Sequence, residues 1–240
     1  MCLKDNGMDT KHIGIVACSA EGAALCYRTI CVEGEEIIGR QPHPEITTHT
    51  HPLSEYMLHI ETGDWRGVAN LMLSSANKLT KAGADFAICP DNTIHQAFDL
   101  FKKKSPIPWL HIAEEVAVEA KRRGHHYLGI LGTRYLMESR VYPNKLAVIG
   151  IKYRIPEVKQ REHINSIIFE ELVKGVLSSN AREYFCRIIT EFKQYGCDAV
   201  VLGCTEIPLL ISQKDSPLPV LDSTRILARA ALKKSINTNH

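Results

Sequence analysis

Residues 83–93, GADFAICPDNT, align without gaps with residues 196–206, GCDAVVLGCTE, of the same 240-residue chain. Each copy has a Gly-x-Asp step, a short apolar run and then a polar cluster. In this alignment Asp91 lies opposite Cys204, so two ionisable side chains hold equivalent places in the two halves of the chain. The repeat predicts two similar structural units, with a proton-transfer group from each unit beside one bound molecule.

A second pair of segments supports the duplication. Residues 13–19, IGIVACS, resemble residues 128–134, LGILGTR, and both pairs are separated by roughly 115 residues. This spacing is much longer than the ~20–50-residue periods of solenoids and propellers. A duplicated domain therefore explains the pattern better than an array of repeats.

Composition and charge are ordinary for a soluble globular protein, with a formal net charge of +2. Lys102, Lys103 and Lys104 form the densest basic cluster and are interpreted as a solvated helix end, so nucleic-acid binding is not suggested. No apolar stretch approaches the ~20 residues of a membrane-spanning helix. Residues 1–11 are polar and unlike a signal peptide, so we expect a cytoplasmic protein that does not bind a membrane.

Apolar runs alternate with segments of helical spacing along the chain. Strands are predicted at residues 12–16, 86–89, 127–131, 150–153, 199–202 and 220–221, with weaker candidates at 46–49, within a loop from 34 to 51, and at 53–60. Helices are predicted at residues 20–31, 65–82, 92–103, 112–123, 134–141, 156–177, 181–195, 206–211 and 223–234. Asp64 is the expected N-cap of the 65–82 helix, and Gly83 is its expected stop.

Strands that alternate with helices indicate parallel sheets that are covered on both faces. With the duplication, this predicts an α/β protein of two similar domains, each a parallel sheet flanked by helices. The first domain would comprise residues 1–112 plus 213–240, with the last helix folded back, and the second residues 113–212. Binding residues should collect after the carboxyl ends of the strands, in the cleft between the domains.

Cys204 has the clearest chemical setting among eight cysteines, none of which forms a C-x-x-C motif. In a reducing compartment most of them should be free thiols, and a zinc ribbon is not expected. Cys204 follows an apolar strand and opens a predicted short helix, where free N–H groups and the helix dipole would lower the thiol pKa. The thiolate could then act as a nucleophile or a base, and the alternative is an inert buried cysteine.

Asp91 stands at the corresponding corner of the first half. Asn92 and Thr93 follow it directly, and Thr205 follows Cys204. These neutral donors, next to predicted helix starts, suit the binding of a substrate carboxylate. The alternative for all of them is helix capping, which uses the same residue types.

Four segments together resemble the aspartate/glutamate racemase family of PLP-independent, metal-free amino-acid racemases. They are DNTIH at 91–95, LGTRYLME at 131–138, IIFEEL at 167–172 and GCTE at 203–206. The resemblance spans about residues 12 to 232. It implies two α/β domains related by a pseudo-twofold axis, no cofactor, and a homodimer. One acid–base residue from each domain would remove or deliver the α-proton on opposite faces of the substrate.

The resemblance also assigns roles to individual residues. Cys204 matches the second catalytic cysteine of the family, and Lys174 lies near a position that binds the distal carboxylate of an acidic amino acid. The alternative for Lys174 is a solvated helix lysine. The α-carboxylate would be held by Asn92, Thr93, Thr133 and Thr205. Aspartate and glutamate are therefore the first candidate substrates.

Two departures from the family pattern bear on these roles. Asp91 stands where the family usually has Cys, and Cys89 is two residues earlier, which is ~6–7 Å along an extended strand. The Gly-rich loop near the family's amino end is replaced by residues 17–22. The Arg that often binds the distal carboxylate is not evident in the segment where Glu45 and His49 stand. The identity of the substrate is therefore open.

Three other interpretations remain. Asp91 could bind only the substrate ammonium, which would leave Cys204 as the sole acid of a decarboxylase or a related isomerase. Two α/β domains around a cleft could also form a small-molecule sensor without catalysis. A metal cluster could form from His43, Glu45, His49 and His51, although the family needs no metal. His95 is expected to orient the Asp91 loop or to pack against it.

Overall fold

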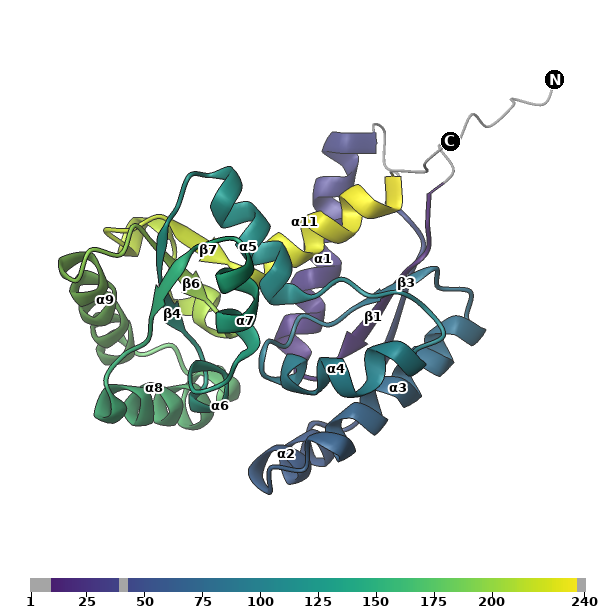
Figure 1. The fold of residues 1–240 in the computed structure, drawn as a ribbon, viewed down its shortest axis with the longest axis horizontal. Helices are drawn as coiled ribbons and strands as arrows, with labels where there is room; N and C mark the ends of the chain where they lie inside the picture. The colour runs from purple at the N-terminus through teal and green to yellow at the C-terminus, as the bar shows by residue number, and fades with distance from the viewer. Residues whose placement is uncertain (1–9, 39–42, 237–240) are drawn as a thin grey trace.

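A computed structural model describes residues 10–38 and 43–236 and contains two parallel β-sheets, each flanked by helices (Figure 1). The first sheet has the strand order β2-β1-β3 and the second β5-β4-β6-β7. Residues 1–9, 39–42 and 237–240, which the sequence assigned to the first domain, lie outside the described residues. The strands are β1 (Ile13–Ala17), β2 (Ile46–Thr50), β3 (Phe86–Ile88), β4 (Tyr127–Leu131), β5 (Lys152–Arg154), β6 (Ala199–Leu202) and β7 (Val220–Asp222).

The two sheets confirm the duplication seen in the sequence. β1 pairs with β3 in the first sheet as β4 pairs with β6 in the second, and these strands carry the repeated segments. The correspondence continues at the next strand position. Trp109 forms an isolated parallel bridge to Ala87 beside β3, where the second sheet has β7 beside β6. All residues of β1, β3 and β6 are buried, as expected for parallel strands covered on both faces.

The helices cover both faces of the sheets. Asp64 caps α3 by accepting a hydrogen bond from the Gly67 N–H, as the sequence predicts, and Gly83 follows this helix with φ +93°. The helices are α1 (Ala20–Ile38), α2 (Leu53–Glu61), α3 (Trp65–Lys81), α4 (Phe98–Phe101), α5 (Ile112–Arg122), α6 (Arg134–Met137), α7 (Val141–Val148), α8 (Val158–Glu170), α9 (Ser179–Gln194), α10 (Ile207–Leu210) and α11 (Ser223–Ile236). Short 3₁₀ turns are η1 (Thr93–Ala97), η2 (Lys102–Lys104), η3 (Leu172–Lys174) and η4 (Gln213–Asp215). No helix within the described ranges combines the length and apolar character that crossing a bilayer requires.

The predicted strand at residues 53–60 is wrong, because this segment forms helix α2. Its buried residues, Tyr56 and Ile60, are four positions apart and lie on one helix face, while Leu58 is 63% exposed. Short apolar runs do not distinguish a strand from a one-sided helix. Other differences concern boundaries: α1 continues past Cys31, and the 92–103 helix is broken into 3₁₀ and α turns.

The last helix of each half packs on the sheet of the other half. α5 follows the first sheet in sequence, but Val116 and Ala120 lie in the same apolar cluster as Leu128 of β4. α11 follows the second sheet, but Leu227 and Leu232 lie in the cluster that covers β1 and β3. The two helices also pack against each other between the sheets (Figure 1). This exchange brings the carboxyl ends of both sheets to one shared cleft.

Candidate active site

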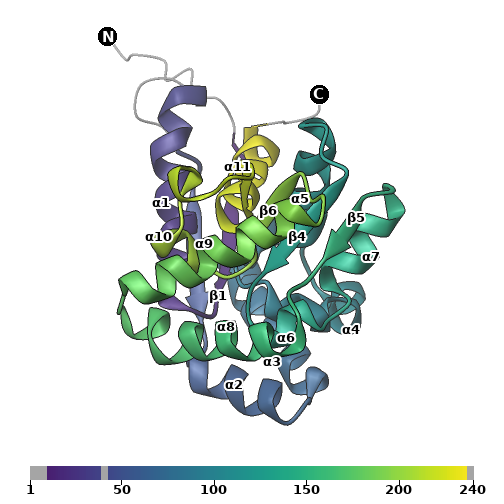
Figure 2. The same cartoon turned by 90° about the vertical axis from the view of Figure 1, so that its left-hand side faces the viewer.

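The cleft between the two sheets contains a pocket at the carboxyl ends of four strands, where parallel α/β sheets usually bind ligands. Polar lining residues come from the loops after β1, β3, β4 and β6. Most apolar lining residues come from α2 of the first half and from α8 and η3 of the second, and α2 and α8 both lie at the lower end of the molecule in Figure 2. Six of the predicted site residues line this pocket: Asp91, Asn92, Thr93, Thr133, Cys204 and Thr205.

The Asp91 corner is formed by the loop after β3 and the loop after β1. The Ser19 backbone N–H donates to Asp91 Oδ2 at 3.2 Å. Burial, followed by the negative charge of Glu206, raises the pKa of Asp91 to about 7, and the hydrogen bonds from Ser19 oppose this rise. Near neutral pH, Asp91 can therefore both hold and release a proton.

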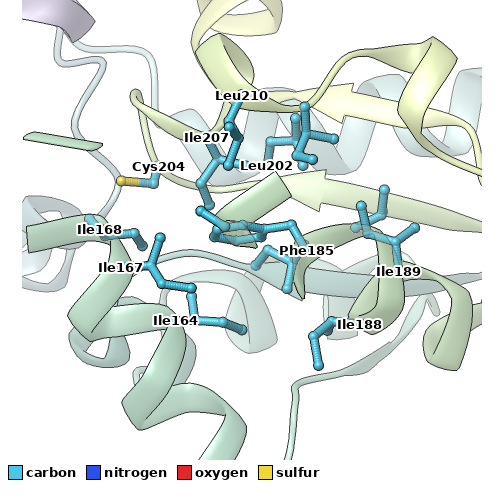
Figure 3. Close-up of a cluster of buried hydrophobic side chains, with 14 of the residues drawn as sticks. Ile164, Ile167, Ile168, Phe185, Ile188, Ile189, Leu202, Cys204, Ile207 and Leu210 are labelled. Carbon is cyan, nitrogen blue, oxygen red and sulfur yellow. The ribbon is translucent and has the colours of Figure 1, made fainter. Parts of the chain in front are cut away.

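The Cys204 corner is formed by the loop after β6. Cys204 is 8% exposed and lies at the edge of the apolar cluster of the second half, beside Ile207, with its sulfur directed away from Phe185 (Figure 3). The thiol donates to Glu206 Oε2 at 2.9 Å, and the Thr205 hydroxyl donates to the same oxygen at 2.7 Å. Glu206 itself is only 4% exposed.

The expected lowering of the Cys204 pKa is wrong. Burial and the adjacent Glu206 carboxylate raise this pKa well above the usual value. α10 begins at Ile207 and has only four residues, so it provides a weaker dipole than the sequence pattern suggested. The resting side chain is a neutral thiol that donates a hydrogen bond to a carboxylate.

Two side-chain hydrogen bonds cross between the halves at the floor of the pocket. Ser19 Oγ and Thr205 Oγ1 are 3.1 Å apart, and Thr93 Oγ1 and Thr133 Oγ1 are 2.9 Å apart. Thr133 also caps α6 by accepting from the Leu136 N–H. These hydroxyls therefore join the two halves and also belong to the lining of the pocket.

Asn92 is held by a buried hydrogen-bond network. Tyr142 Oη donates to Asn92 Oδ1 at 2.7 Å, and Asn92 Nδ2 donates to Ser223 Oγ at 2.9 Å. Ser223 in turn donates to the Leu202 carbonyl at 2.8 Å. The side-chain amide of Asn92 thus fastens the Asp91 loop to α7 and α11, and its role in binding a carboxylate remains a prediction.

Lys174 is not brought to the pocket. It is exposed at the end of η3, whereas its neighbour Val173 is among the lining residues. Glu45 lies before β2 at the opposite edge of the sheet, where it is 3.8 Å from His12. The His49 ring bonds to Ser75 of α3 and also lies outside the pocket.

The histidine segment bonds to α3 instead of forming a cluster. His51 Nε2 lies 3.2 Å from Ser74 Oγ, and His49 Nε2 lies 2.9 Å from Lys78 Nζ. Within residues 10–38 and 43–236, no three His, Cys, Asp or Glu side chains are grouped as metal ligands. His95 is buried and bonds to the Cys89 carbonyl at 3.0 Å, so it fastens the loop that carries Asp91, as the sequence suggested.

Sequence reasoning missed three features of the site. Ser19 and Cys18 reach Asp91 from the loop after β1, and the sequence signal was the polar step that follows this strand. Glu206 belongs to the GCTE motif, yet its contact with Cys204 depends on how the loop turns. The third feature is the set of apolar residues of α2 that line the pocket, which the strand predicted at residues 53–60 does not indicate.

Comparisons with known proteins agree with this fold. The chain is 33% identical to a candidate Asp/Glu racemase from Yersinia pestis, with a TM-score of 0.87 over 95% of this chain and 100% of the other. It is 30% identical to an aspartate racemase homologue from Pyrococcus horikoshii, with a TM-score of 0.81 over 94% and 99% of the two chains. The broad-specificity amino-acid racemase RacX of Bacillus subtilis is 25% identical over 67% of this chain and 69% of RacX.

The curated glutamate racemases that the chain also matches are covered less completely. The match spans 49% of the enzyme from Pediococcus pentosaceus and 67% of the enzyme from Fusobacterium nucleatum. A family model described as Asp/Glu/hydantoin racemase matches residues 34–231. The chain belongs to this family of amino-acid racemases, which are isomerases.

Proposed function

We propose that this protein is a cofactor-independent racemase of a free α-amino acid, and that Asp91 and Cys204 exchange protons with opposite faces of Cα. The observation that carries the proposal is the pairing of the two corners. Asp91 and Cys204 follow equivalent strands of the two halves, and both line one pocket. Groups that approach from two domains suit proton removal on one face and delivery on the other.

The protonation states of the two corners support a direction for the first step. With a pKa of about 7, Asp91 is largely a carboxylate at slightly alkaline pH and can accept the α-proton. Cys204 holds a proton that it can deliver from the other face, because burial and Glu206 keep it as a thiol. In the reverse direction the Cys204 thiolate is the base and protonated Asp91 is the acid.

The remaining polar groups suit the two ends of an amino acid. Asp91 and Glu206 provide negative charge for the ammonium group. The hydroxyls of Thr93 and Thr133 are neutral donors for the α-carboxylate, and Thr205 would join them by exchanging its hydrogen bond to Glu206 for one to the substrate. A bound ammonium near Glu206 would also offset the negative charge that raises the Cys204 pKa.

The test follows the α-proton directly. Common amino acids, including aspartate and glutamate, are incubated with the protein in D2O, with exchange followed by NMR and inversion by chiral chromatography. We expect both exchange and inversion with the wild type. Asp91→Asn should retain slow exchange at one face but lose inversion, whereas Asp99→Asn, at an exposed residue outside the pocket, should behave as the wild type.

Other outcomes would favour the other interpretations. Exchange or loss of CO2 without inversion by the wild type, with only a raised KM in Asp91→Asn, would indicate a one-base enzyme in which Asp91 binds the ammonium group. Saturable binding without any exchange would indicate a sensor. No exchange of any common amino acid by the folded protein would overturn the racemase proposal. The expected cytoplasmic homodimer is a separate proposal, and light scattering of the purified protein tests its oligomeric state.

A further inference from the structure

The pocket has two chemically different ends. The acid–base groups and hydroxyls lie at the carboxyl ends of the strands. The opposite wall is formed by apolar side chains of α2, α8 and η3, which face the same pocket from the two halves. They are Leu53, Met57, Ile60, Ile168, Phe169 and Val173. A molecule whose Cα lies between Asp91 and Cys204 would extend its side chain toward this wall.

Positive charge is missing from this wall. In the part of the chain that the structure describes, no lining residue is Lys, Arg or His. The nearest cations along the chain are Arg134 and Lys174. Arg134 is exposed and stacks over the Tyr135 ring at 5.5 Å, and Lys174 is exposed at the end of η3. Neither residue is part of the lining.

Among the described residues, the pocket lining has two acidic side chains and no basic one. Asp91 and Glu206 both line it, and the charge of Glu206 acts on Asp91. A bound amino acid uses its ammonium group to balance one of these charges and its α-carboxylate to occupy the hydroxyl donors. A second, distal carboxylate would be repelled by the two acidic side chains and would lie against an apolar wall without a cation. This binding mode is strongly disfavoured, because a buried charge needs a partner.

We infer that the preferred substrate has an apolar side chain, such as that of methionine, leucine or phenylalanine, and is neither aspartate nor glutamate. This inference rests on the proposed racemase function for its chemistry and on the composition of the pocket wall for its specificity. Burial of the substrate side chain against six apolar residues favours binding through the removal of apolar surface from water. It departs from the acidic substrate that the sequence resemblance predicted.

The first experiment compares kcat/KM for α-proton exchange across methionine, leucine, phenylalanine, aspartate and glutamate. We expect the best apolar amino acid to exceed the best acidic one by roughly 100-fold. A parallel measurement of thermal stabilisation by each amino acid reports binding without chemistry. Failure of exchange for all of them would overturn the racemase proposal, while the binding ranking would still decide the side-chain preference.

A matched pair of variants tests the wall itself. Met57→Lys places a cation in the pocket, and Leu58→Lys places one on the adjacent exposed position of α2, outside the lining. Met57→Lys should shift the ratio of kcat/KM for aspartate over methionine by roughly 100-fold toward aspartate, because the new ammonium pairs with the distal carboxylate. Leu58→Lys should leave this ratio unchanged.

Two results would overturn the inference. One is a wild-type preference for aspartate or glutamate, in exchange or in binding. If Lys174→Met then removed that preference, Lys174 would be the group that binds the distal carboxylate. The other is a Met57→Lys ratio equal to that of Leu58→Lys, because the α2 wall would then not contact the substrate side chain.

Discussion

The corner at Asp91 and the corner at Cys204 have equivalent places in the two halves, yet they hold their protons differently. Asp91 accepts a hydrogen bond from the Ser19 N–H and has a pKa near neutrality. Cys204 donates a hydrogen bond to Glu206 and has a pKa raised well above the ordinary thiol value. The two halves share the same strand arrangement, but the side chains around the two corners differ and give them different protonation states.

This difference shows that strand position fixes where a reactive group lies, while its contacts fix what it can do. Glu206 acts on both corners, because its charge raises the pKa of Asp91 and of Cys204. The first-half position that aligns with Glu206 holds Thr93, which instead bonds to Thr133 across the cleft. Burial is the larger cause of both pKa rises, and the Glu206 carboxylate, which belongs to one half only, adds to each of them.

The largest expected effect comes from removing the thiol. Cys204→Ser should lower racemisation by roughly 10³-fold, because a serine hydroxyl is far less acidic and its alkoxide is inaccessible near neutral pH. The rate is measured with the amino acid that the wild type exchanges fastest. Cys186→Ser is the matched control, since this cysteine bonds to the Asp215 carbonyl outside the pocket. Full activity of Cys204→Ser would contradict the role assigned to the thiol.

A smaller effect concerns stability. The pKa of Asp91 is raised from 3.8 to about 7 in the folded protein, so the fold favours the protonated form and loses stability as pH rises through this range. At pH 8, Asp91→Asn should increase the free energy of unfolding by on the order of 4 kcal/mol, and this gain should vanish below pH 4. Urea unfolding at both pH values measures it. An equal gain at both pH values would contradict the assignment, and Asp99→Asn should show neither.

The smallest effect tests the influence of one corner on the other. Wild-type activity that depends on Asp91 as the base should fall as pH decreases through about 7, where the carboxylate becomes protonated. Glu206→Gln removes the negative charge that raises this pKa, so the acidic limb of kcat/KM should move down by about one pH unit. Glu138→Gln, whose carboxylate pairs with Arg161, should leave the limb in place. An unmoved limb in Glu206→Gln would show that the corners titrate independently.

Much of the fold could be predicted because its signals are local. The buried strands β1, β3, β4 and β6 are short apolar runs, and Asp64 and Gly83 mark the ends of α3 within a few residues. The repeat then related the two sheets without knowledge of any long-range contact. The α2 segment is different, because its short apolar run suits a strand as well as a helix, and only the structure shows that Tyr56 and Ile60 are its buried positions.

The electrostatics of the site could not be predicted in the same way. Ser19 and Thr205 are far apart in the sequence, and only the packing of the two halves brings their hydroxyls to 3.1 Å. Glu206 is two residues from Cys204, but its burial and the direction of its side chain decide the thiol pKa. Residue type and order carry no information on these distances, so the pattern suggested a thiolate where the structure has a thiol.

The exchange of α5 and α11 between the halves has a consequence for how the protein is made. A ribosome completes β1 and β3 long before it adds Leu227 and Leu232, which cover one side of the first sheet. Until then Ile13 and Phe86 have α1 but lack their last covering helix, and apolar surface left open in this way promotes aggregation. The half that is synthesised first therefore cannot complete its core until nearly the whole chain has been made.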